Sequence, residues 1–128
     1  MGVHHKICHT LGGTYNLPHA PGHSAVVAYA ADFNRDHAPS AMAALVRGLN
    51  AGGIPCTDAA QGIWDLATRI GAPTSLAEVG FRAEDIDEAA QIVADAKPVN
   101  PRPVDVDGVR ALLALACAGT RPEPGGAR

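Results

Sequence analysis

Apolar residues recur three and four positions apart along much of this sequence, and no other feature limits its fold as strongly. The spacing i, i+3, i+4, i+7 occurs in four segments, residues 42–49, 63–70, 86–93 and 109–116. Each segment would carry one apolar stripe if it formed an α-helix. A further buried helix is expected over residues 23–34, where alanine favours helix over strand. No convincing alternation of period two is seen. The sequence therefore predicts an all-α helical bundle of about five to seven helices.

Capping and breaking residues indicate where these helices begin and end. Thr57 or Asp58 can cap the helix that contains residues 63–70, and Asp105 can cap the last helix. The segment 97–103 holds three prolines, which remove hydrogen-bond donors and favour extended backbone. It is therefore expected to be a loop that connects the last two helices.

The length and the end of the chain suggest one domain followed by a tail. At 128 residues the chain is the size of an ordinary domain. Residues 120–128 contain proline and glycine without apolar periodicity, so we expect them to be a disordered tail. The helical domain is accordingly expected to span residues 1–119.

Charge and cysteine content exclude several classes of protein. The formal net charge is −3 and no basic run is present, which argues against nucleic-acid binding. No stretch approaches the roughly 20 apolar residues of a membrane span, and no signal peptide is visible. The cysteines number three and form no CxxC pair. These features favour a soluble protein of the cytoplasm.

Histidines are concentrated near the start of the chain, where residues 4–23 hold five of the six. His5 and His9 are four residues apart, which places both imidazoles on one face of a helix. The glycine pair at 12–13 is expected to end that helix, and the next segment can then return His19 towards His5 or His9. Three converging imidazoles suit Zn, Fe or Ni, or a site of proton transfer.

The neighbouring residues have simpler interpretations. His4 points to another side of the same helix, so we expect it to be solvated or to support a ligand without being one. Cys8 is expected to be a small buried hydrophobic residue. His37 follows an acidic turn and is expected at the surface.

The histidine-rich run also carries a family resemblance. Residues 4–19, HHKICHTLGGTYNLPH, resemble the signature of maleylacetate reductases, a group within the iron-containing alcohol dehydrogenases. That signature reads H-x3-H-x-L-G and is followed by P-H. Residues 71–80, GAPTSLAEVG, and 100–104, NPRPV, resemble further segments of the family in the same order. The resemblance covers almost the whole chain.

The resemblance implies a fold and a reaction. Family members join an N-terminal α/β domain, which binds NADH or NADPH, to a C-terminal all-helical domain of the dehydroquinate synthase-like type. Catalysis takes place in the cleft between the two domains. Maleylacetate reductases reduce the carbon–carbon double bond of maleylacetate to give 3-oxoadipate in the breakdown of aromatic compounds.

The same resemblance implies roles for three histidines. In relatives that use a metal, one Asp and three His bind Fe or Zn, and His5 and His19 match two of the histidine ligands. His9 matches a nearby histidine that faces the nicotinamide and the substrate. Catalytic roles are therefore expected for His9 and His19, and metal-binding roles for His5 and His19. In maleylacetate reductases these histidines would alternatively hold the carboxylate-rich substrate.

The sequence contains no GxGxxG or other glycine-rich nucleotide-binding segment. We therefore expect the N-terminal nucleotide-binding domain to be absent from this chain, no cofactor-binding residue to lie in it, and the isolated chain to be inactive. The expected partners are that missing domain or its split-gene counterpart and the small-molecule substrate. Self-association into a homodimer is also expected, because an isolated helical half would leave an apolar face exposed.

Two other interpretations remain open at this stage. The chain would alternatively be a fragment of a metal-dependent alcohol dehydrogenase, in which Fe or Zn polarises an alcohol or carbonyl oxygen. The third interpretation is a non-enzymatic helical protein that binds a metal through its histidines or docks onto a partner.

Overall fold

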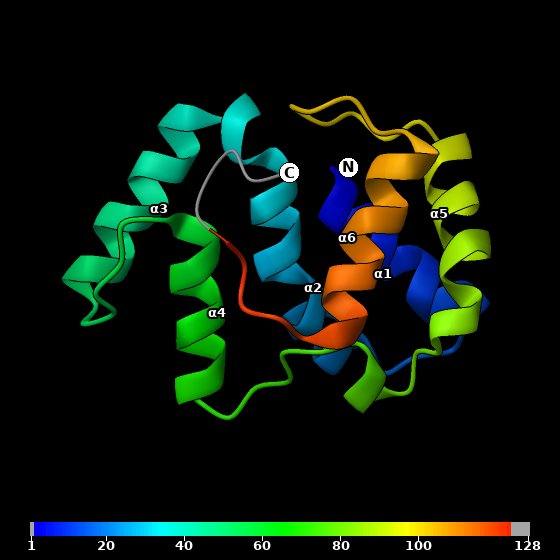
Figure 1. Ribbon diagram of the computed structural model, residues 1–128, viewed down its shortest axis with the longest axis horizontal. Helices are drawn as coiled ribbons and strands as arrows, with labels where there is room; N and C mark the ends of the chain where they lie inside the picture. The colour runs from blue at the N-terminus through cyan, green and yellow to red at the C-terminus, as the bar shows by residue number, and fades with distance from the viewer. Residues whose placement is uncertain (1, 124–128) are drawn as a thin grey trace.

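All regular secondary structure in the computed structural model, which describes residues 2–123, is helical (Figure 1). The α-helices are α1 (Val3–Thr14), α2 (His19–Asn34), α3 (Pro39–Ala51), α4 (Ala59–Arg69), α5 (Ile86–Asp95) and α6 (Val106–Ala118). Three short 3-10 turns are η1 (Arg35–His37), η2 (Ala77–Val79) and η3 (Ala83–Asp85). The expected all-α fold is confirmed.

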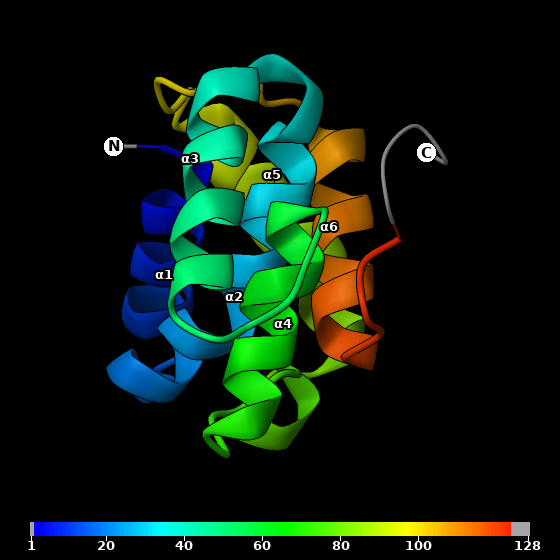
Figure 2. The same cartoon turned by 90° about the vertical axis from the view of Figure 1, so that its left-hand side faces the viewer.

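The main core lies among four helices. Helix α1 packs on α2 and α5, and α6 packs on α5 and α2 (Figure 1). Helix α4 packs on α2, and α3 in turn packs on α4; Figure 2 shows α3 nearest the viewer on this side of the molecule. The largest fully buried side chains of the core are Val3, Ile7, Leu11, Val26, Tyr29, Leu76, Val93, Val109 and Leu113. Helix α2 contacts α1 and α6 as well as α4, so it forms the centre of the domain.

Helix starts follow the predicted capping residues. Asp58 accepts a hydrogen bond from the backbone N–H of Gln61 at 3.0 Å, so it caps α4 in preference to Thr57. Asp105 accepts from the N–H of Gly108 at 2.7 Å and caps α6. Both carboxylates satisfy donors that the first helical turn leaves unpaired.

The proline-rich loop ties the start of α1 to the end of α2. Asn100 lies within the predicted loop 97–103, and its side-chain oxygen accepts a hydrogen bond from the N–H of Val3 at 3.1 Å. Its amide group donates to Asn34 Oδ1 at 2.6 Å. The hydrogen bonds of Asn100 thus hold the start of α1, the helix that carries His4, His5 and His9, against the end of α2.

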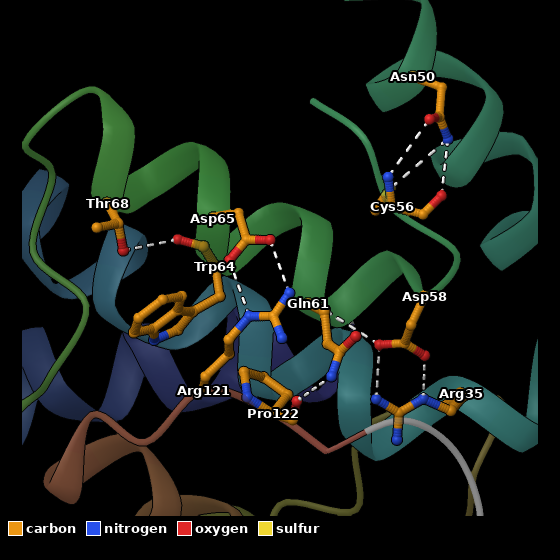
Figure 3. Close-up of polar contacts among 10 residues, drawn as sticks. All are labelled: Arg35, Asn50, Cys56, Asp58, Gln61, Trp64, Asp65, Thr68, Arg121 and Pro122. Atoms are coloured by element: carbon orange, nitrogen blue, oxygen red, sulfur yellow. Dashed lines mark hydrogen bonds and ion pairs between the residues drawn. The ribbon is translucent and has the colours of Figure 1, made fainter. Parts of the chain in front are cut away.

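Residues 121 and 122, which lie within the expected tail, contact α4. Figure 3 shows Arg121 paired with Asp65 through two hydrogen bonds of 2.9 and 2.8 Å. Gln61 donates to the carbonyl of the buried Pro122 at 2.9 Å. These contacts come from α4 and hold the segment against it. The rest of the expected tail, 124–128, lies outside the described residues, and the domain boundary at residue 119 stays a prediction.

An apolar groove lies between α3 and α4. The groove there is lined by apolar and small residues that include Leu45, Leu49, Ile54 and Leu66, and Leu45 is 40% exposed. No residue of α3 is buried. Despite this surface, every helix within residues 2–123 is too short or too polar to cross a membrane.

Candidate functional site

The histidines of the N-terminal region lie where α1 and α2 pack together. Val3, Ile7 and Leu11 point from α1 into the core and fix the rotation of that helix. With this rotation His5 and His9 are exposed, whereas His4 is half-buried beside α2. One residue along an α-helix turns the side chain by about 100°. Two adjacent histidines therefore have different surroundings.

Helix α2 begins with the next two histidines of the cluster. Pro18 precedes its first residue with φ −58, the value that proline fixes and that a helix start accepts. The helix therefore begins at His19 and includes the buried segment expected over residues 23–34. His19 is exposed and His23, one turn later, is half-buried against α1. The spacing of four places both rings on one face of α2.

The rings of the two helices meet at His23. Its ring centroid lies 4.2 Å from that of His19 and 5.1 Å from that of His4. His4 Nε2 lies 3.3 Å from the backbone carbonyl oxygen of His23 and 3.6 Å from Cys8 Sγ. The contact between α1 and α2 thus contains two imidazoles and one thiol in direct contact, with His19 at the edge.

Burial determines the protonation of His4, His23 and Cys8. It lowers the pKa of His4 more than the hydrogen bond with the His23 carbonyl raises it. Burial also lowers the pKa of His23, assisted by the nearby charges of His19, His4 and His5. Both imidazoles are therefore neutral near pH 7, with a nitrogen lone pair free to accept a proton or a cation. Burial raises the pKa of Cys8 to about 12, so its sulfur carries a proton.

The three histidines predicted to form the site are placed as follows. His5, His9 and His19 are all exposed, and His19 contacts His23. Among residues 2–123, the side chain of His9 makes no hydrogen bond, ion pair or ring contact. His5 lies close enough to His4 and His23 to influence their pKa. A common site for His5, His9 and His19 stays a prediction.

Three residues of this cluster were expected to have a different role or none. Cys8 is buried, as expected for a small hydrophobic residue, but it also contacts His4. His4 supports the cluster from within α1, and His23 was given no role. His4 and Cys8 are four residues apart, as are His19 and His23. This repeated spacing places each pair on one helix face and is the sequence signal that could have indicated the cluster. His37 lies at the surface, as expected.

The glycine pair at 12–13 does not end α1, which continues to Thr14. The chain instead turns at Asn16, whose φ of 55 is left-handed, and the N–H of Leu17 donates to the carbonyl of Leu11. Asn tolerates this conformation because its side chain can bond locally. The expectation failed because α1 is anchored in the core by Leu11, and this packing outweighs the low helix propensity of two glycines.

The two glycines continue the face of α1 that carries His5 and His9; Gly13 is exposed and Gly12 is half-buried. Positions 5, 9, 12 and 13 are spaced i, i+4, i+7 and i+8, so His5, His9, Gly12 and Gly13 form one stripe. A Cβ added at Gly12 or Gly13 would meet nothing within 4 Å. Packing within the described residues therefore does not require glycine at either position. Glycine in a helix interior costs up to about 1 kcal/mol relative to alanine, and the close approach of another molecule would explain it.

Comparisons with known proteins place the chain among dehydrogenases. The family described as "Fe-containing alcohol dehydrogenase family, C-terminal" matches residues 1–117. Maleylacetate reductase 1 of Rhodococcus opacus is 44% identical over 122 residues, which cover 95% of this chain and 33% of that protein. The chain thus spans about a third of the length of the curated relative that it matches.

Solved structures give the same result. The crystal structure of maleylacetate reductase from Rhizobium sp. strain MTP-10005 has a TM-score of 0.81 and 40% identity, covering 95% of this chain and 33% of that chain. An iron-containing alcohol dehydrogenase from Corynebacterium glutamicum has a TM-score of 0.83 and 39% identity, covering 94% and 33%. The helical fold is therefore shared with one part of these longer chains.

Proposed function

The chain belongs to the Fe-containing alcohol dehydrogenase family through that family's C-terminal region, and from this membership we propose that it is the C-terminal helical part of an NAD(P)H-dependent maleylacetate reductase. The proposed reaction is the reduction of maleylacetate to 3-oxoadipate. Relatives named maleylacetate reductase, at 38–44% identity, support the choice of reaction.

One observation carries the proposal: the sequence motif that resembles the reductase signature forms an open surface. His5 and His9 are exposed on α1, and His19 is exposed at the start of α2. Gly12 and Gly13 extend the α1 face without needing to be glycine for any contact within the described residues. Such a surface suits one wall of a cleft, with the substrate and a nucleotide-binding part on its other side.

The histidines have distinct roles in the proposed reaction. NAD(P)H, when bound, supplies the hydride that is added to the alkene carbon of the substrate. His9 or His19 donates a hydrogen bond to an oxo or carboxylate oxygen of maleylacetate. This bond stabilises the negative charge that develops on the conjugated oxygen as an enolate forms. Both side chains are exposed and make no hydrogen bond within residues 2–123, so neither must break one there to do so.

His5 and His19 are the proposed ligands of an iron or zinc ion if the intact reductase uses one. Their exposed imidazoles are nitrogen donors of the kind that both metals accept. The donor set fits a metal only in part, since a stable zinc or iron site requires three or four ligands. The remaining ligands are proposed to come from the nucleotide-binding part. Without an ion, the same two imidazoles would bind a substrate carboxylate.

The proposal is tested by reconstitution. We expect the 128-residue chain alone not to oxidise NADH in the presence of maleylacetate, and the addition of a nucleotide-binding part from a close relative to restore turnover. His9→Ala should then remove most of that turnover, by about 100-fold or more if it is a general acid or a polarising donor. His37→Ala is the matched control, because His37 is an exposed histidine on η1, outside α1 and α2.

Two results would contradict the proposal. Turnover by the isolated chain would show that the surface is not one half of a site. Equal turnover of His9→Ala and His37→Ala in the reconstituted enzyme would remove the role of His9. Reduction of aldehydes in preference to maleylacetate would instead support an alcohol dehydrogenase, the function that the Corynebacterium glutamicum structure favours.

A further inference from the structure

A second group of possible metal ligands lies behind the exposed histidine surface. His4 and Cys8 come from successive turns of α1, and His23 comes from the facing turn of α2. Each residue offers one ligand atom, and these three atoms all lie within 4.8 Å of one another. Among the described residues this is the one group of three or more His, Cys, Asp or Glu side chains with such spacing.

The spacing is close to that around a tetrahedral metal ion. Bonds of roughly 2.3 Å to sulfur and 2.0 Å to nitrogen, at a tetrahedral angle, separate the two ligand atoms by about 3.5 Å. Cys8 Sγ and His4 Nε2 are 3.6 Å apart. The His23 ring already contacts the His4 ring, at a centroid separation of 5.1 Å. The ligand atom of His23 lies within 4.8 Å of the other two ligand atoms, so His23 is placed to supply the third ligand.

The donor types select a class of ion. Thiolate and imidazole ligands suit zinc and similar borderline-soft ions, whereas magnesium and calcium prefer oxygen. His4 Nε2 lies 3.3 Å from the backbone carbonyl oxygen of His23, so metal binding at this nitrogen replaces that hydrogen bond and leaves the ring proton on Nδ1. The Cys8 sulfur carries a proton in the free chain, and this proton would leave as the metal–sulfur bond forms. No oxidant or reductant takes part.

The fold holds the ligands in place before any ion arrives. Asn100 fixes the N-terminus of α1 one residue before His4, and the core residues Val3 and Ile7 prevent that helix from rotating. His23 lies on α2, the most central helix of the domain. Ligands on packed helices lose little side-chain freedom when they bind, which favours affinity.

We propose that His4, Cys8 and His23 form a binding site for Zn²⁺ or another borderline-soft divalent ion, with a fourth coordination position open to solvent. The site contains sulfur, and it is distinct from the proposed His5 and His19 ligands, which contain none. It is also independent of the proposed reductase function, because it uses none of the residues assigned to that reaction.

Cobalt(II) titration of the purified chain under reducing conditions tests the site. A thiolate–cobalt bond produces an ultraviolet charge-transfer band, which histidine and carboxylate ligands do not give. We expect the band to saturate at one ion per chain and to be abolished by competing zinc. Cys8→Ser should abolish the band, and His23→Gln should weaken cobalt binding by more than the roughly 10- to 100-fold that losing an outer-shell partner costs.

Three control variants distinguish binding at this site from binding at the remaining cysteines and histidines. Cys56→Ser and Cys117→Ser should retain the band, since both thiols lie outside the cluster. His5→Gln should also retain it, which would show that His5, a ligand of the other proposed metal site, is not involved. Circular dichroism verifies that each variant is helical. If the buried Cys8→Ser variant fails to fold, the half-buried His23→Gln variant gives the decisive measurement.

The proposal is overturned by either of two outcomes. Cobalt excess without a charge-transfer band would show that sulfur is not a ligand. A band that persists at full intensity and affinity in His23→Gln or Cys8→Ser would place the bound ion elsewhere. Neither outcome bears on the reconstitution experiment with maleylacetate, so the two proposals fail separately.

Discussion

Replacing Asp58 by alanine should lower the stability of the domain more than any other single change at a helix start. Asp58 is 9% exposed and performs two functions at once (Figure 3). It caps α4 through the N–H of Gln61, and both of its oxygens accept hydrogen bonds from Arg35, at 2.6 and 2.8 Å. The pair joins the 3-10 turn that follows α2 to the first turn of α4. The substitution therefore removes both a cap and a contact between elements.

The expected loss is about 3 kcal/mol of the free energy of unfolding. Loss of an N-cap contributes about 1 kcal/mol. Loss of hydrogen bonds between charged groups contributes roughly 1.5–3 kcal/mol. We place the second contribution near its lower end, because Arg35 retains a hydrogen bond to Asp32 at 2.5 Å and is not left as an isolated buried charge. Domains of this kind have about 5–15 kcal/mol in total, so the effect is large.

Urea unfolding, followed by circular dichroism, measures the effect, and two further variants partition it. Asp58→Asn retains an oxygen that can cap α4 and removes the charge, so it should lose about 1 kcal/mol less than Asp58→Ala. Asp65→Ala breaks the more exposed pair with Arg121 and should cost no more than about 1 kcal/mol. A loss below about 1 kcal/mol for Asp58→Ala, or equal losses for Asp58→Ala and Asp65→Ala, would refute this reasoning.

The carboxylate of Asp58 also makes the stability of the domain depend on pH. Burial alone would raise the pKa of Asp58, but hydrogen bonds from Arg35 and Gln61 and the charge of Arg35 together lower it below the ordinary value of 3.8. The unfolded chain therefore binds the proton at a higher pH than the folded chain. The stabilisation is complete above the unfolded pKa and is lost as the pH falls through the folded pKa. Wild type should thus lose stability more steeply than Asp58→Asn below about pH 4.

Three further changes have defined outcomes. Gly12→Ala should raise the free energy of unfolding of the chain by up to about 1 kcal/mol, because the added methyl group meets open space. The same variant should lower turnover of the reconstituted reductase. Unchanged turnover would argue against the close approach of another molecule at Gly12. Tyr29→Phe removes the hydroxyl that donates to the carbonyls of Thr74 and Thr120 and should cost about 1–3 kcal/mol in urea unfolding. Leu45→Lys should weaken the expected self-association in sedimentation velocity, since Leu45 is 40% exposed in the apolar groove between α3 and α4.

Features determined by a few adjacent residues were predictable from the sequence. Asp58 and Asp105 cap the helices for which they were proposed, because a cap depends only on residues within one turn. The three prolines of residues 97–103 lie in the loop between α5 and α6, as expected, because proline restricts its own backbone and that of the preceding residue.

Features that depend on distant packing were not predictable in this way. The glycine pair at 12–13 looked like a helix end, but Leu11 in the core holds α1 in helical form beyond it. Residues 120–123 have no apolar period, yet Gln61 and Asp65 of α4 bind them. Leu11 is buried because α2 and α5 pack on α1, and residues 121 and 122 are held by α4, so in both cases the deciding contacts come from other helices. Local pattern alone carries no information about such partners.

The rotation of α1 explains why neighbouring histidines can serve separate purposes. His5 and His9 face outward because Val3, Ile7 and Leu11 face the core. The same rotation brings His4 against α2, where it contacts Cys8 and His23. The sequence shows the spacing within each helix, but only the packing of α1 against α2 shows which imidazoles meet. A histidine count therefore could not separate the exposed histidines of the proposed reductase surface from the histidines that contact Cys8, whereas the contact of α1 with α2 does.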